Sequence, residues 1–227
     1  MDISKNNRDR TKLNLHPARW LLYLAIVVTF AGCRFNVGIL RGILGDLMEP
    51  SAFEMRTDVN LADGNDRLLI LCSASHGVMN ESASLPIDIL SKVSVQLRNH
   101  GVDVVDPDDV ANWLDDNGSL DDLTSLATEF DADYIAVIRI QSLSYTEPNS
   151  DLLRARATGD IRVHKVMHDE DGRVVEQYGT AINEVYPKTY PISADKLSHG
   201  MFQKQALDYL SDVFARQFHR YHQRDTI

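Results

Sequence analysis

Cysteine is scarce in this 227-residue chain, which contains only Cys33 and Cys72. At most one disulfide can form, so the fold must depend on an apolar core and not on a disulfide framework. Internal repeats and low-complexity tracts are also missing. With 44% hydrophobic and 25% charged residues, the composition is typical of a globular protein. The length suits one domain with a sizeable core.

Basic residues are few beyond the amino terminus. Residues 1–32 hold five basic and two acidic side chains, whereas the rest of the chain holds 18 basic and 31 acidic ones. A body with this negative charge is repelled by nucleic acid and by anionic lipid headgroups. We therefore expect no nucleic-acid partner. A solvated acidic surface and a basic protein partner are both compatible with the charge.

Familiar catalytic motifs are missing as well. There is no Gly-x-x-x-x-Gly-Lys phosphate loop, no His-Glu-x-x-His zinc helix and no Gly-x-Ser-x-Gly elbow. Ser75 and His76 follow an expected strand at 68–73, and Asp106 follows another at 102–105. The carboxyl ends of such strands often hold sites, so a hydrolase or small-ligand cleft near these residues is the alternative function. No triad can be assigned, and a polar loop is the simpler interpretation.

Two histidine pairs have spacings that metal sites also use. His164 and His168 are four residues apart in an expected strand, and His219 and His222 are three apart near the end of an expected helix. A metal site needs three or four converging ligands, whereas solvated polar residues explain both pairs. We therefore expect no metal, no cofactor and no catalytic residue.

The amino terminus has the three-part pattern of a secretory signal. Residues 1–19 are polar and basic, residues 20–32 form an uncharged and largely apolar run, and small residues precede Cys33. The run is shorter than the ~20 residues that span a bilayer. Extending it would bring Arg34 and Arg41 into the span. The pattern predicts a signal peptide over residues 1–32.

Ala31-Gly32-Cys33 resembles the lipobox of bacterial lipoproteins, in which signal peptidase II cuts before a lipidated cysteine. Phe30 stands where the family usually has Leu. The resemblance implies recognition through Phe30, Ala31 and Gly32, a palmitate-containing lipid on Cys33, and a chain that is anchored to a membrane and faces the periplasm. With Arg34 in place of Asp after the cysteine, the chain resembles lipoproteins that are sorted to the outer membrane. An uncleaved anchor and a coincidental cysteine are the alternatives.

Residues 33–66 are expected to comprise the lipidated cysteine and a linker. Apolar residues in 37–48 have helical spacing, but three glycines weaken an autonomous helix. This stretch could lie on the membrane, pack on the domain or serve as a tether. Pro50 and the segment 61–66 indicate loop. One α/β domain is expected over residues 67–222.

Alternating strand and helix patterns predict the fold of this domain. Expected strands at 68–73, 102–105 and 134–140 are separated by helices beginning at Pro86, over 107–114 and over 120–130. Right-handed crossovers make these strands parallel. An antiparallel hairpin over 153–167 and 174–185 follows, and then a long carboxyl-terminal helix from an N-cap at Ser193 to about His222. The prediction is an α/β fold with two or three layers and a mixed sheet.

Two segments carry a family resemblance, namely Val104-Val-Asp-Pro-Asp-Asp-Val110 and Phe130-Asp-Ala-Asp-Tyr-Ile135, the latter before a long hairpin with an Asp-Gly turn. The pattern over roughly 67–217 resembles the domain shared by the TolB amino-terminal module, curli-secretion (CsgG-type) lipoproteins and lipoprotein activators of penicillin-binding proteins. It is also similar to envelope lipoproteins without an assigned activity. The resemblance implies an envelope accessory protein that works through surfaces. Charges on both faces of the single hairpin disfavour a membrane pore.

Acidic residues are concentrated in one part of the expected domain. The possible partner surface comprises Asp108, Asp109, Asp115, Asp116, Asp121 and Asp122. Carboxylates at helix starts also complement helix dipoles, so a structural role competes with a binding role. We expect a non-catalytic interaction or assembly module that contacts another envelope protein, with a purely structural lipoprotein as a further possibility.

Overall fold

The computed structural model describes residues 48–117, 122–168 and 173–222. The chain divides into two units, Met1–Leu47 and Met48–Ile227, and the described residues all belong to the second. The signal segment, Cys33 and most of the stretch 37–48 lie outside them. None of the described helices is long and apolar enough to cross a bilayer.

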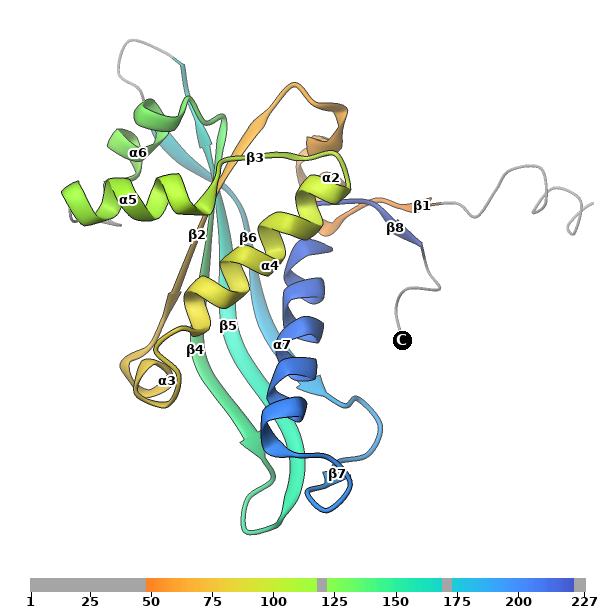
Figure 1. Ribbon diagram of the computed structural model, residues 1–227. Coiled ribbons are helices and arrows are strands. Elements are labelled where there is room, and N and C mark those ends of the chain that lie inside the picture. The colour runs from red at the N-terminus through yellow and green to blue at the C-terminus, as the bar shows by residue number, and fades with distance from the viewer. Residues whose placement is uncertain (1–47, 118–121, 169–172, 223–227) are drawn as a thin grey trace, which may run out of the picture. The chain divides into compact units, whose positions relative to one another are not determined.

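A six-stranded mixed sheet forms the centre of the domain (Figure 1). Its strands are β2 (Arg67–Ala74), β3 (Asp103–Val104), β4 (Tyr134–Thr146), β5 (Leu152–Val166), β6 (Val174–Tyr186) and β7 (Ile192–Ser193). The order is β3-β2-β4-β5-β6, and β7 pairs with β5. β3, β2 and β4 are parallel, whereas β4, β5 and β6 are antiparallel. This arrangement confirms the predicted fold class.

Two helices cover one face of the sheet, which we call the helix-covered face. They are α4 (Leu85–Asn99) and α7 (His199–Ala215). Leu85, Ile89, Val93 and Leu97 recur every four residues and are buried, so one stripe of α4 faces the strands. Pro86 lies in the first turn of α4, where its missing N–H leaves no hydrogen bond unmade. This face holds the larger apolar core.

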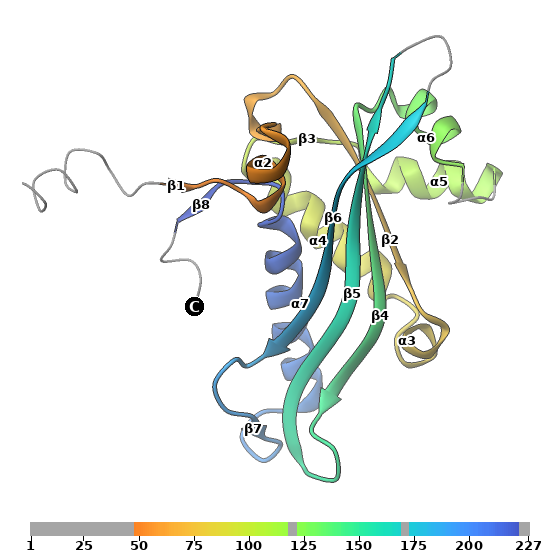
Figure 2. The same cartoon turned by 180° about the vertical axis from the view of Figure 1, so that it is seen from behind.

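The opposite face is covered only in part, and we call its uncovered portion the open face. The helices α5 (Pro107–Asn117) and α6 (Leu123–Phe130) pack over one end of the sheet, where Leu69, Ile135 and Leu126 join a second core. Figure 2 shows the remaining lengths of β4, β5 and β6 with no described helix in front of them. Charged side chains on these strands therefore reach solvent.

The segment before the sheet packs with the domain. It forms β1 (Met48–Glu49), α2 (Ala52–Thr57) and the 3-10 turn η1 (Leu61–Asp63). Phe53 is fully buried and makes edge-on ring contacts with Tyr134 at 5.6 Å and Tyr178 at 5.8 Å. Leu61 is also fully buried. The loop expected at 61–66 therefore contributes to the core, and the folded unit begins at Met48.

The last helix begins later and ends earlier than expected. Ser198 is the N-cap of α7, and its hydroxyl accepts a hydrogen bond from the Met201 N–H at 3.4 Å. The expected cap at Ser193 is wrong because this residue lies in β7, opposite Leu152 of β5. α7 ends at Ala215, and β8 (Tyr221–His222) then pairs antiparallel with β1.

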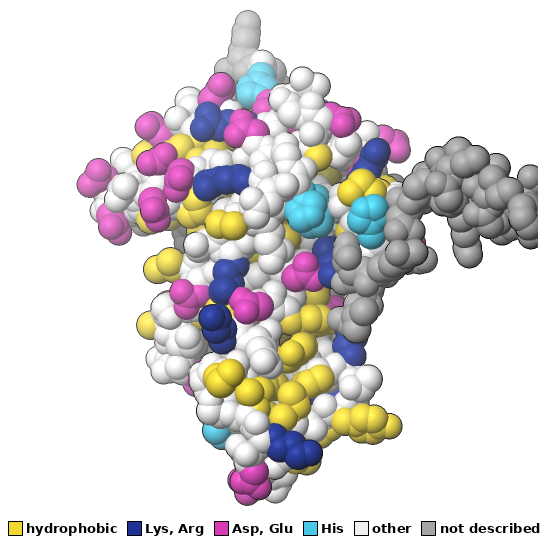
Figure 3. Space-filling model, turned by 45° about the vertical axis from the view of Figure 1, so that its right-hand side comes forward, with side chains coloured by type: hydrophobic (Ala, Val, Ile, Leu, Met, Phe, Trp, Pro, Cys, Tyr) yellow, Lys and Arg dark blue, Asp and Glu magenta, His cyan; other side chains and the backbone are white. Residues whose placement is uncertain are grey.

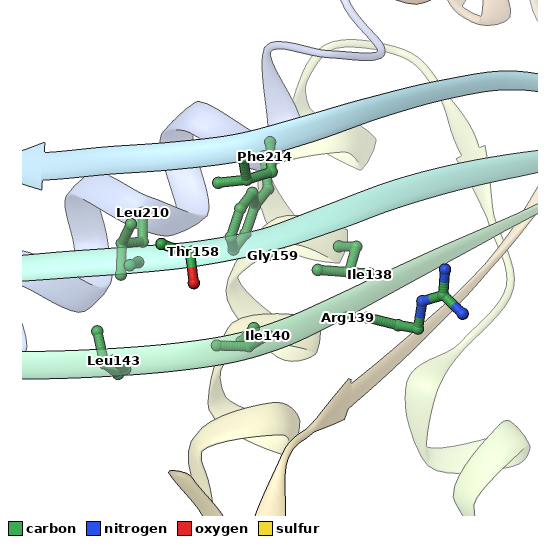
Figure 4. A pocket seen from close by; sticks show the side chains of 10 residues that line it. Ile138, Arg139, Ile140, Leu143, Thr158, Gly159, Leu210 and Phe214 are labelled. Carbon is green, nitrogen blue, oxygen red and sulfur yellow. The ribbon is translucent and has the colours of Figure 1, made fainter. Parts of the chain in front are cut away.

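Gly159 permits an unusually close contact between β4 and β5. A Cβ on Gly159 would lie 2.1 Å from the Arg139 carbonyl oxygen, which no side chain can tolerate. Nearby, Leu210 and Phe214 of α7 face the strands and line a cavity of about 10 Å³ (Figure 4). A cavity of this size holds one water at most, so it is a packing void and not a ligand site.

Candidate functional site

The three residues of the alternative cleft do not converge. Ser75 is the N-cap of a short helix, α3 (His76–Glu81), and its hydroxyl donates to the Gln141 carbonyl at 2.8 Å. The expected polar loop is thus partly helical. β3 pairs with Arg67 and Leu68 at the start of β2. Asp106 follows β3, so it lies roughly 20 Å along the strand from Ser75 at ~3.3 Å per residue.

Asp106 instead has a local role. Its carboxylate accepts the Asp108 N–H at 3.0 Å near the start of α5 and pairs with Arg98 at 3.5 Å. These contacts satisfy one free N–H of the helix and join α5 to α4. The hydrolase interpretation therefore loses the convergence of side chains on which it depended.

The histidine pairs are also engaged elsewhere. His168 contacts the Asp133 carboxylate at 2.9 Å. His219 is buried, and its ring stacks on His100 with centroids 3.7 Å apart. Burial lowers the pKa of His219, so its neutral form is favoured. Within the described ranges, no three histidine, cysteine, aspartate or glutamate side chains converge on a common point.

A hollow of about 320 Å³ lies on the open face beside α6. Leu71 and Val137 give it an apolar lining, and Arg139, Arg162 and His164 add polar groups. Ser73 of β2 also lines it, so the hollow occupies the end of β2 that the sequence indicated, with different partners. Among these side chains the sequence had drawn attention to His164, as a possible metal ligand beside His168. Its position next to Arg139 and Arg162 was not foreseen, because strand register across β4 and β5 brings them together.

Ion pairs fill the polar side of this hollow. Asp160 of β5 binds Arg139, with Nη2 and Oδ2 2.5 Å apart, and Arg162, with Nε and Oδ2 3.2 Å apart. Arg162 also pairs with Glu176 of β6 at 3.1 Å. Partial burial raises the pKa of Asp160, but the two guanidinium groups outweigh that effect and lower its pKa overall. The charges across three strands are therefore largely balanced.

Cys72 lies next to the hollow and packs against the core. Burial raises the pKa of its thiol to about 12. The thiol is therefore protonated at neutral pH and is a poor nucleophile. It gives the hollow no obvious covalent chemistry.

The acidic residues gather on the lobe formed by α5 and α6. Residues 103–133 contain eleven acidic side chains and no basic one. Figure 3 shows acidic side chains crowded at this end of the domain. Asp121 lies outside the described residues, and Asp122 caps α6 by accepting the Ser125 N–H at 3.0 Å.

Helix dipoles explain only part of this acidic lobe. Asp108 and Asp109 lie in the first turn of α5, where negative charge is favourable. Asp115 and Asp116 lie in its last turn, and that turn has no basic residue. Carboxylates at a helix carboxyl end interact unfavourably with the dipole. Asp115 and Asp116 therefore reduce helix stability, and a structural role does not account for them.

No protein-family model matches the chain, and no curated protein sequence matches it either. Solved structures resemble the fold at low identity. A PelC dodecamer from Paraburkholderia phytofirmans has 11% identity and a TM-score of 0.38, covering 72% of this chain and 94% of that chain. A lipoprotein from Neisseria meningitidis has 15% identity and a TM-score of 0.35, covering 65% of this chain and 99% of that chain.

The LpoB C-terminal domain from Salmonella enterica has 10% identity and a TM-score of 0.31, covering 58% of this chain and 90% of that chain. These likenesses concern the course of the chain through a mixed α/β domain. They assign no activity, ligand or partner to this protein.

Proposed function

We propose that this protein is a lipid-anchored envelope lipoprotein whose α/β domain acts as a non-catalytic interaction module. The observation that carries the proposal is the lipobox-like Ala31-Gly32-Cys33 at the end of a signal-like segment. A compact unit begins at Met48, 15 residues after Cys33. A tether of that length reaches at most ~50 Å, so the domain would work close to a membrane surface.

Metabolic labelling with a clickable fatty acid tests the anchor. Wild-type protein should carry the label and sediment with membranes, whereas Cys33→Ala should lose both properties. Cys72→Ala is the matched control, because it removes the other thiol and should keep the label. Label that persists in Cys33→Ala, or that disappears in Cys72→Ala, would refute acylation at Cys33.

The acidic lobe supports a basic envelope protein as the partner. Asp115 and Asp116 cost helix stability, and they stand on a surface whose charge has one sign, so binding gives a reason for their presence. A surface whose charges all have one sign attracts a partner of the opposite charge and speeds their association. The acidic lobe would thus orient the partner and raise its rate of association more than it would raise the affinity of the complex.

Cross-linking in intact cells tests this surface. Asp115→Asn with Asp116→Asn should weaken capture of the partner while leaving the domain folded and slightly more stable. The matched control is Asp151→Asn with Asp195→Asn, which removes two exposed charges away from the lobe. Equal capture by both double variants would eliminate the acidic lobe as the docking surface.

Arg34 supports placement in the outer membrane, because arginine and not aspartate directly follows Cys33. Density-gradient separation of the two membranes should find the wild-type protein in the outer-membrane fraction. Arg34→Asp should move it to the inner membrane, and Arg41→Asp should not. Wild-type protein in the inner-membrane fraction would contradict this placement and leave the anchor itself intact.

A further inference from the structure

A groove of about 390 Å³ lies between α4 and α7, at the end of the domain away from the acidic lobe. Its apolar lining comes from Leu85, Leu207 and Tyr145. Glu81 and Asp88 contribute carboxylates from α3 and α4, and Lys204 contributes an ammonium group from α7. Figure 3 shows acidic and basic side chains together on this face. The volume falls within the range of small-molecule sites.

The charges that line the groove differ in how well they are satisfied. Lys92 is neutralised by Asp208, with Nζ and Oδ1 2.5 Å apart. The Asp88 carboxylate accepts a hydrogen bond from the Ser84 hydroxyl at 2.9 Å but has no ion pair with any described residue. The side chains of Glu81 and Lys204 are exposed and have neither a hydrogen bond nor an ion pair with the described part of the chain. Two carboxylates and one ammonium group therefore line one groove without forming ion pairs with each other.

Tyr145 lies beside the carboxylates. Burial raises the pKa of its phenol, and the negative charges of Glu81 and Asp88 raise the pKa further. Its hydroxyl makes no hydrogen bond to a described residue, and its ring is partly exposed within the groove. An aromatic face next to carboxylates attracts an ammonium group by charge and by cation–π interaction.

We propose that this groove binds a small zwitterion, namely an amino acid or a short peptide with a free ammonium and a free carboxylate. The ammonium group contacts Glu81, Asp88 and the ring of Tyr145, and the carboxylate contacts Lys204. Apolar atoms between the two charges pack on Leu207. This site requires neither the lipid at Cys33 nor a protein partner, so it goes beyond the proposed function.

Calorimetric titration of the full-length protein in detergent micelles tests the site. The probes are alanyl-alanine, its N-acetyl derivative, its carboxamide and the dipeptide blocked at both ends. We expect saturable binding of alanyl-alanine, with a Kd on the order of millimolar. Each single block should weaken binding by up to about fivefold, the upper end of the range for one exposed charge pair. The absence of saturable binding, or equal binding of the doubly blocked dipeptide, would overturn the proposal.

Variants assign each end of the ligand. Glu81→Gln should reduce the difference in affinity between alanyl-alanine and its N-acetyl derivative, because Asp88 and Tyr145 remain, and Lys204→Met should bind alanyl-alanine and its carboxamide equally. Asp195→Asn and Lys196→Met, which remove comparable charges outside the groove, should behave as wild type. Asp88→Asn and Lys204→Gln replace the first pair if either of those does not fold. Unchanged discrimination between the probes in the groove variants would refute the assignment.

Discussion

The two faces of the sheet use the same strands for different purposes. On the helix-covered face, Ile138, Ile161 and Val163 are buried against α4 and α7. On the open face, their neighbours Arg139 and Arg162 reach solvent and form ion pairs. Because successive side chains of a strand point to opposite faces, one register serves both arrangements. The covered face therefore provides most of the stability, and the open face provides charge-dependent contacts.

The largest loss of stability should come from a substitution in the amino-terminal segment that packs on the covered face. Phe53→Ala removes a fully buried ring and should lower the free energy of unfolding by about 3–5 kcal/mol. Met55→Ala is the matched control in the same helix. Because Met55 is 64% exposed, its truncation should hardly change the free energy of unfolding. Chemical denaturation measures both changes. Similar small losses would mean that residues 48–63 do not belong to the folded unit.

The second-largest loss of stability should come from a substitution at the close contact between β4 and β5. Gly159→Ala should lower the free energy of unfolding by at least about 2 kcal/mol, because the strands must separate to admit the methyl group. Gly200→Ala, in the first turn of α7, has no atom within 4 Å of the added group and should be neutral or stabilising. Thermal unfolding of the two variants distinguishes them. Equal melting temperatures would contradict the close approach.

Charge removal on the open face should have a smaller effect. Asp160→Asn should cost about 1 kcal/mol, because solvent screens the ion pairs of Arg139 and Arg162. The lowered pKa of Asp160 stabilises the fold above the unfolded value of about 4, and this contribution is lost as the pH falls through the folded pKa. Denaturation at several pH values should therefore show wild type and variant converging in acid. A constant difference would exclude this origin.

The smallest effect should come from His219, at the edge of the covered core. Its folded pKa is lowered by burial, so below pH ~6.5 the unfolded state binds a proton that the folded state does not. Stability should decline as the pH falls through that window and should decline less in His219→Gln. His199→Gln, at an exposed position, is the control. Parallel pH profiles for wild type and His219→Gln would refute this contribution.

Strongly patterned segments allowed most of the fold to be predicted. The apolar runs at 68–73 and 134–140 could be interpreted correctly because continuous apolar runs of this length are typical of buried strands. The stripe expected on the helix after Pro86 was wrong in part, because Ile87 and Val95 are exposed. Phe53 and Leu61 were missed because isolated apolar residues among polar ones produce no period. Ser193 and Ser198 are both plausible caps in sequence. Pairing of Ser193 with β5, a tertiary contact, decides between them.

The candidate sites were harder to predict because they depend on register and not on motif. Asp106 would have met Ser75 only if β3 paired with the carboxyl end of β2, but β3 is short and pairs with its beginning. The groove beside Tyr145 joins residues from α3, α4, β4 and α7, which no local pattern connects. The acidic lobe was visible in sequence because its residues are adjacent.

Anchoring by a lipid is the claim on which the proposed function depends, and intact mass spectrometry of the protein purified from its native membrane tests it most directly. We predict a chain that begins at Cys33 and carries the added mass of a diacylglycerol on its thiol. A chain that begins at Met1, or a Cys33 thiol without added mass, would contradict the account.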